Sequence, residues 1–204
     1  MEIFKLISLL SLFLFVGCAD EAQKEITTIE PGATAPSFNL KNIDGQLVSP
    51  ESYPDAKGFI VVFTANTCPI AKKYEDRLIA LGKNYNFKGY PVIAINANTP
   101  GLLAGDGYEK MQKRAKTKGF TFPYLYDEGQ KVTDQYGARV TPHVFLLKRE
   151  GSGLKVVYTG AIDNDIENEN PDKTLFVENA ITSLEAGKQI EVASTKAIGC
   201  AVKR

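Results

Sequence analysis

Residues 59–81 read FIVVFTANTCPIAKKYEDRLIAL, an apolar run that leads into an amphipathic segment with one cysteine at the junction. The run FIVVFTA is continuous and rich in β-branched residues, which predicts a strand buried on both faces. From residue 70 onward the apolar residues recur at helical spacing. One face carries Ile70, Tyr74, Leu78, Leu81 and Tyr85, and the other carries Lys72, Lys73, Glu75 and Asp76. The stretch therefore predicts a strand, a short turn and a helix.

Cys68 lies at the turn between these two elements, and Pro69 follows it. Proline suits the first helical position, because its missing N–H would have no helical partner there in any case. A thiol at this place faces unpaired backbone amides and the positive end of the helix dipole, which favour the reactive thiolate. The alternative is a buried, inert cysteine that fills a small apolar space. Its position at a helix start, rather than inside an element, favours a functional cysteine.

The rest of the chain predicts further strands and helices around this unit. Residues 38–48 alternate around Asp44-Gly45, which is typical of a β-hairpin. We expect a second buried strand at 91–98 and an antiparallel hairpin from 143–148 and 155–160. Asp106 and Glu109 suggest a capping box that opens a helix with Tyr108, Met111 and Ala115, closed by Gly119, and a last helix over 175–184 ends at Gly187. This pattern predicts an α/β domain with a mixed central sheet.

The N-terminus predicts export from the cytoplasm. Residues 1–16 combine Lys5 with an apolar run that is too short to span a bilayer and is followed by a polar segment. LFVGC, residues 14–18, resembles a bacterial lipobox, so we expect a lipoprotein-type signal peptide over 1–17 and lipidation of Cys18. An ordinary cleaved signal with an incidental cysteine is the alternative. Either way we expect an extracytoplasmic protein of the bacterial cell envelope, where disulfides can form.

The composition of the chain and its polar segments indicate the domain organisation and exclude some classes of partner. Residues 18–32 read as a tether, 33–190 as one domain and 191–204 as a tail that carries Cys200. Lys plus Arg and Asp plus Glu both number 24, without a block of either sign, so nothing indicates a nucleic-acid partner. The chain has three cysteines and one histidine, His143, which excludes a zinc-type cluster. We expect no metal and no organic cofactor.

Several segments together resemble the peroxiredoxin-like branch of the alkyl hydroperoxide reductase/thiol-specific antioxidant group, the redoxins. They are the hairpin, residues 59–81, the INAN strand end, RAKTKGFTFPYLYDEGQ, YGARVTPHVFLL, YTGAID and the closing GCAVKR. The resemblance implies a thioredoxin-like fold with an N-terminal β-hairpin, and a thiol-dependent oxidoreductase of the antioxidant or thiol–disulfide exchange type. It implies that Thr141-Pro142 is the cis-proline loop facing the active cysteine, and Cys200 matches the terminal Gly-Cys of the family.

Two departures from the family pattern bear on the activity. Related proteins often carry Cys-x-x-Cys at this turn, but the first position here is Ala65, so exchange within that motif is impossible. A peroxiredoxin has Pro-x-x-x-Thr-x-x-Cys, whereas the matching positions hold Val61 and Ala65. The hydroxyl that helps to orient a peroxide is therefore absent there, although Thr64 and Thr67 are close.

On this resemblance we hypothesise that Cys68 attacks a disulfide or a peroxide, and that Cys200 resolves the mixed disulfide or sulfenic acid. An external thiol reductant would then restore the dithiol. The Thr141-Pro142 loop would hold the substrate, and the lipid on Cys18 would join the protein to the membrane. Arg139 could reach Cys68 and lower the pKa of its thiol, or could point into solvent.

The same residues leave other functions open. A permanent Cys68–Cys200 bridge would pin the tail and stabilise the fold. Cys68, Cys200 and His143 could together bind a soft ion such as Cu(I). A redox-inactive fold could serve as an interaction module, since Ala65 has replaced one thiol.

Overall fold

The computed structural model describes residues 26–98, 101 and 103–204. The expected signal peptide, the lipidated Cys18 and the first part of the tether lie outside these residues. In the part that is described, no helix has the length and apolar character needed to cross a membrane.

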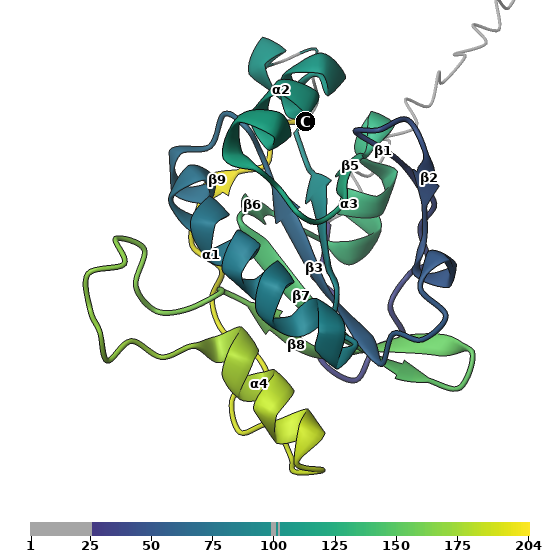
Figure 1. Ribbon diagram of the computed structural model, residues 1–204, viewed down its shortest axis with the longest axis vertical. Coiled ribbons are helices and arrows are strands. Elements are labelled where there is room, and N and C mark those ends of the chain that lie inside the picture. Colours follow the sequence, from purple (N-terminus) through teal and green to yellow (C-terminus); the bar gives the residue numbers. More distant parts are fainter. Residues whose placement is uncertain (1–25, 99–100, 102) are drawn as a thin grey trace, which may run out of the picture.

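A mixed sheet forms the centre of the molecule (Figure 1). Among the described residues it has seven strands, in the order β2-β1-β5-β4-β3-β7-β8. Strands β3, β4 and β5 run parallel, and every outer strand is antiparallel to its inner neighbour. The bounds are β1 (Leu40–Asn42), β2 (Leu47–Val48), β3 (Gly58–Thr64), β4 (Val92–Asn96), β5 (Tyr124–Tyr126), β7 (His143–Glu150) and β8 (Gly153–Gly160). A separate antiparallel pair consists of β6 (Val140–Thr141) and β9 (Cys200–Ala201).

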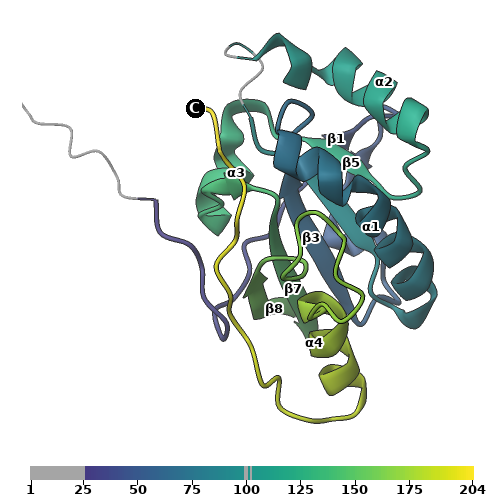
Figure 2. The same ribbon diagram turned by 90° about the vertical axis from the view of Figure 1, so that its left-hand side faces the viewer.

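Helices cover both faces of the sheet. The α-helices are α1 (Pro69–Tyr85), α2 (Tyr108–Lys118), α3 (Lys131–Tyr136) and α4 (Phe176–Glu185). Short 3-10 turns lie at η1 (Pro50–Ser52), η2 (Asn86–Lys88), η3 (Ala104–Asp106) and η4 (Glu128–Gln130). Figure 2 shows α1 and α4 on one side of the sheet and α3 on the other, with the C-terminal tail returning along the α3 side.

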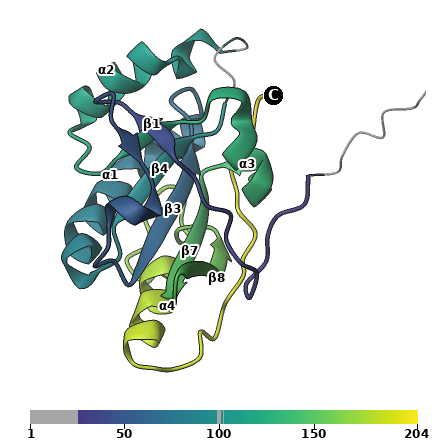
Figure 3. The ribbon, with the colours of Figure 1, turned by 90° about the vertical axis from the view of Figure 1, so that its right-hand side faces the viewer.

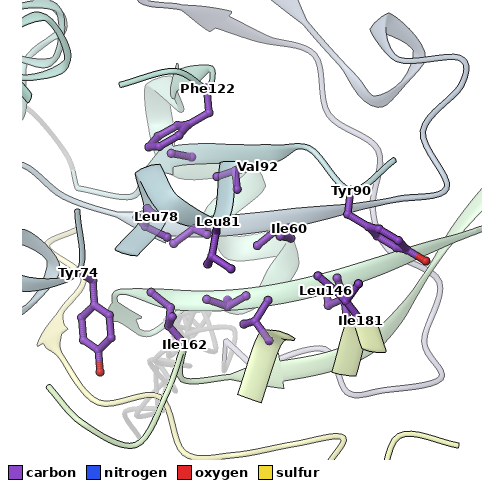
Figure 4. Close-up of a cluster of buried hydrophobic side chains, with 14 of the residues drawn as sticks. Ile60, Tyr74, Leu78, Leu81, Tyr90, Val92, Phe122, Leu146, Ile162 and Ile181 are labelled. Atoms are coloured by element: carbon purple, nitrogen blue, oxygen red, sulfur yellow. The ribbon is translucent and has the colours of Figure 1, made fainter. Parts of the chain in front are cut away.

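Strand β3 supplies both halves of the core, because its side chains alternate between the two faces. Ile60 and Val62 pack beneath α1 and α4 with Leu78 and Ile181, in the cluster drawn in Figure 4. Phe59, Val61 and Phe63 point to the opposite face and pack with Tyr136 and Val202 of α3 and the tail. Figure 3 shows this second side, where α3 and the tail lie. Every residue of β3 is buried, so the prediction of a strand buried on both faces is confirmed.

The expected α/β class and most of the long elements are confirmed. The hairpin turns at Asp44-Gly45, where Gly45 adopts a φ of +88°. Helix α1 begins at Pro69, and α2 ends before Gly119, which has a left-handed φ of +69°. The hairpin β7–β8 is longer than expected at both ends of its turn.

Three details of the sequence prediction are wrong. The capping box at Asp106 does not form, because Gly107 is the residue that precedes α2 and the Asp106 carboxylate bonds elsewhere. Glu75 is not on a solvent face, since it is 5% exposed and pairs with Arg114. Leu175 precedes α4 rather than lying within it. The short elements β5, β6, β9 and α3 were not predicted, because segments of so few residues show no clear periodicity of apolar side chains.

Candidate active site

Cys68 lies at the start of α1, shortly after the end of β3. It is the N-terminal capping residue, with extended φ and ψ of −75° and 116°, and Pro69 occupies the first helical position. The Ala71 backbone N–H points at Cys68 Sγ, 3.3 Å away, and the Lys72 N–H donates to the Cys68 carbonyl. The sulfur therefore lies at the end of the helix that carries unpaired amides and positive potential, as expected.

The loop before β7 lies against this sulfur. The Thr141–Pro142 peptide bond is cis, as the resemblance implied. The Thr141 carbonyl oxygen is 3.0 Å from Cys68 Sγ, and Thr141 and Pro142 are both buried. The structure thus brings together residues that are 73 positions apart in the chain.

A disulfide joins Cys68 to Cys200, with a Cα–Cα separation of 5.8 Å. The tail reaches Cys68 by pairing with the cis-proline loop, so that Thr141 lies opposite Cys200 and Val140 opposite Ala201. Gly199 permits this approach, because a Cβ there would lie 2.0 Å from the Thr141 carbonyl oxygen. Cys68 is 2% exposed, whereas Cys200 is only partly buried.

The tail is held by more than its cysteine. The Val202 N–H donates to the Arg139 carbonyl, and the Lys203 N–H donates to Asn98 Oδ1, both at 2.9 Å. Val202 is buried in the core, and Arg204 forms an ion pair with Asp134 at 3.1 Å. Cys200 is therefore placed by a docked segment rather than by the disulfide alone.

A buried carboxylate, Asp106, organises the turn just before Cys68, and the sequence did not reveal this role. Asp106 is fully buried and accepts the backbone N–H of Asn66 at 2.6 Å and that of Thr67 at 3.3 Å. It also accepts the Thr67 hydroxyl at 2.5 Å and the Asn98 amide at 3.0 Å. Because Asn98 also binds Lys203 N–H, this network joins the Cys68 turn to the tail. The feature of the sequence that could have indicated this network is the pair of asparagines, Asn96 and Asn98, at the end of a buried strand.

Two other predicted candidates take less central positions. The Arg139 side chain is exposed and, within the described residues, makes no hydrogen bond or ion pair. His143 is a packed histidine: its ring lies against Phe145 and its Nε2 is 3.1 Å from Thr159 Oγ1. Burial lowers the pKa of His143 to about 4. The described part of the chain contains no group of three or more His, Cys, Asp or Glu side chains that could hold a metal ion, and the sulfurs of Cys68 and Cys200 are joined to each other.

The sheet order, the cis-proline loop and the cysteine at the start of α1 define a protein of the thioredoxin-like fold. The chain belongs to the AhpC/TSA family, whose profile matches residues 31–156. It is 28% identical over 136 residues to "Thiol-disulfide oxidoreductase ResA" of Halalkalibacterium halodurans, which covers 67% of this chain and 73% of that protein.

Solved structures support the same fold. A conserved protein from Geobacillus kaustophilus, described as uncharacterized, is 34% identical, with a TM-score of 0.78 over 85% of this chain and 92% of that one. Peroxidoxin BcpB from Mycobacterium tuberculosis is 18% identical, with a TM-score of 0.59 over 78% of this chain and 97% of that one. This last likeness concerns the fold alone.

Proposed function

We propose that this protein is a thiol–disulfide oxidoreductase that uses Cys68 as the attacking thiolate and Cys200 as the resolving thiol. The observation that carries the proposal is the disulfide between a cysteine at a helix start and a cysteine in a tail docked on the cis-proline loop. The name of the Halalkalibacterium halodurans relative supports this reaction class. Position 65 holds alanine instead of the threonine whose hydroxyl helps to orient a peroxide, and this favours a disulfide as the substrate.

In the reduced protein, the amides at the start of α1 favour the Cys68 thiolate. This thiolate attacks one sulfur of a substrate disulfide, so that a mixed disulfide forms and the other substrate sulfur leaves as a thiolate. Cys200 then attacks Cys68 Sγ, which forms the Cys68–Cys200 bridge and releases the second substrate thiol. The substrate gains two electrons and the protein loses them.

Regeneration requires an external thiol reductant, and we propose that it attacks Cys200. Cys68 is 2% exposed in the bridged form, whereas Cys200 is partly accessible. Attack on Cys200 makes Cys68 the leaving group, and a stabilised thiolate leaves faster. The difference in exposure thus gives the two sulfurs different tasks.

Thr141 and Pro142 would present the backbone surface against which the substrate sulfur is held. This role is supported by the 3.0 Å contact between the Thr141 carbonyl and Cys68 Sγ. Arg139, two residues before Thr141, has an exposed side chain and would add positive charge near the site. No metal or organic cofactor has a part in this scheme.

We further propose that the protein works outside the cytoplasm, anchored through Cys18 to a membrane of the cell envelope. The N-terminal sequence supports this location, with 1–17 as signal peptide and 18–32 as tether before the domain at 33–190 and the tail at 191–204. Metabolic labelling with a fatty acid tests it: Cys18→Ser should lose the label and release the protein from membranes.

Stopped-flow oxidation of the reduced protein tests the activity. We expect a model disulfide to react with the reduced protein much faster than with an unfolded peptide thiol, and Cys68→Ser to abolish the reaction. Cys200→Ser should stop at a stable mixed disulfide, which mass spectrometry detects. A faster reaction with peroxide than with disulfide would make the protein a peroxidase instead. A bridge that thioredoxin-like reductants cannot reduce would make it a structural staple.

A further inference from the structure

A basic groove lies beside the turn that carries Cys68. It has a volume of about 360 Å³ and opens between the start of α1 and α2. Lys72 of α1 and Lys110, Lys113 and Arg114 of α2 line it, together with Thr67, which directly precedes Cys68. No acidic residue is among the described residues that line the groove.

Three of these charges lack a counter-charge. Arg114 is paired with Glu75 at 2.6 Å, so its charge is largely compensated. Lys72, Lys110 and Lys113 are exposed and make no ion pair or side-chain hydrogen bond within the described part of the chain. Like charges at spacings of three residues on a helix, such as Lys110 and Lys113, are mildly destabilising. The sequence nevertheless places them together around a concave surface.

The position of the groove links it to the reaction site. Thr67 lies in its wall, and the Lys72 N–H donates to the Cys68 carbonyl at 3.1 Å. The positive end of the α1 dipole adds to the field of the lysines. A concave surface of one sign raises the local concentration of oppositely charged ligands and speeds their encounter.

We propose that this groove binds the acidic side chains that flank the disulfide of a peptide substrate. The inference rests on the proposed function, and it adds a substrate class: disulfide-bearing segments rich in Asp and Glu. Carboxylates carry the charge opposite to that of ammonium groups and accept hydrogen bonds from them. Because Thr67 of the groove directly precedes Cys68, a segment whose sulfur reacts with Cys68 would bring its neighbouring carboxylates toward Lys72, Lys110 and Lys113.

Three disulfide peptides of equal length test the proposal. Their flanking residues are acidic, neutral or basic, and each reacts with the reduced protein at low and at high ionic strength. We expect the acidic peptide to react about tenfold or more faster than the neutral one at low ionic strength, with the preference shrinking as salt screens the charges. The ratio of the two rates is the readout, because a change in Cys68 reactivity affects both peptides alike.

A charge-reversal variant locates the effect. Lys72→Glu, Lys110→Glu and Lys113→Glu together should remove or reverse the preference. The control is Lys83→Glu, Lys131→Glu and Lys188→Glu, which changes the net charge equally at exposed lysines outside the groove. The proposal is overturned if the wild type shows no preference, or if both variants lose it equally.

A binding measurement separates this proposal from the proposed function. The acidic peptide with serine in place of cysteine is titrated calorimetrically into the oxidised wild type and both variants. Binding that only the groove variant loses supports the groove even if no disulfide reacts, a result that would end the oxidoreductase proposal. Absence of binding together with equal rates for all three peptides would end the groove proposal alone.

Discussion

At the scale of single residues, Asp106 shows how one buried carboxylate positions the turn before Cys68. Four donors from Asn66, Thr67 and Asn98 converge on its two oxygens. Such a site requires acceptors only, and a carboxylate is the side chain that supplies them.

Asp106→Asn should therefore destabilise the protein, since its amide would turn an N–H₂ toward other donors. We expect a loss of about 2–3 kcal/mol in the free energy of unfolding, measured by urea denaturation. Asp134→Asn is the matched control, because Asp134 is exposed and pairs only with Arg204 among the described residues. It should lose less than about 1 kcal/mol. Equal effects of the two substitutions would contradict the role assigned to Asp106.

His143 makes stability depend on pH. Burial lowers its folded-state pKa from 6.5 to about 4, so the unfolded chain binds a proton in this window and the folded protein does not. As pH falls from about 6.5 to 4, the free energy of unfolding should drop by about 3 kcal/mol from this group. Above pH 6.5 its contribution is constant.

Two measurements check this prediction. His143 is the single histidine of the chain, so its NMR titration in the folded protein is free of overlap. His143→Gln removes the group, and its unfolding free energy should fall less than that of the wild type across the same pH range. An NMR titration with an ordinary pKa near 6.5 would show that the ring is not shielded as the structure indicates.

At the scale of elements, an ion pair ties α1 to the segment after β8. Arg77 makes two hydrogen bonds to the Asp163 carboxylate, at 2.7 and 2.8 Å, and further bonds to the carbonyls of Asp165 and Ile166. The Asp163 side chain is fully buried and that of Arg77 is 13% exposed. The Tyr74 hydroxyl also donates to Asp163, and burial is the main reason that its pKa rises to about 12.

Asp163→Ala should cost about 3–5 kcal/mol, because it leaves the Arg77 guanidinium largely buried without its partner. Glu150→Ala removes one partner from exposed pairs with Lys148 and Lys155, and should cost less than about 1 kcal/mol. Thermal unfolding of both variants compares the two kinds of ion pair. A small effect at Asp163 would mean that the segment rearranges and that α1 is not held through it.

At the scale of the whole molecule, the Cys68–Cys200 bridge closes a loop over 132 positions. Loop-closure entropy predicts that the bridge stabilises the fold by up to about 5 kcal/mol, chiefly by restricting the unfolded chain. We expect reduction, or Cys200→Ser, to lower the free energy of unfolding by several kcal/mol without loss of the fold. The hydrogen bonds of Val202 and Lys203 do not involve the bridge, so we expect them to hold the end of the tail in both cases.

Denaturation of oxidised and reduced protein measures this difference, and circular dichroism checks that the reduced fold persists. Lys196→Ser serves as the control, because it changes an exposed residue of the tail outside the bridge and should leave stability unchanged. Unfolding of the reduced protein in the absence of denaturant would contradict the prediction, and would identify the bridge as a requirement for folding.

The sequence by itself determined the strand, turn and helix of residues 59–81, the place of Cys68 at the helix start, and the hairpins. These features are local: side-chain periodicity, a proline at the first helical position and turn residues act over a few positions. The cis-proline loop and the thioredoxin-like class were accessible through the family resemblance, because several motifs recur together in that group.

Tertiary structure alone decided the register of Cys200 on Thr141, the burial of Asp106 and Glu75, and the groove between α1 and α2. Each joins segments that are far apart in the chain, and β6 and β9 have two residues each, too few to show a pattern. Hydrogen bonds and charges of this kind form only when the packed sheet brings their partners together. The spacing of residue types along the sequence therefore does not predict these contacts, although every residue that forms them can be read from the sequence.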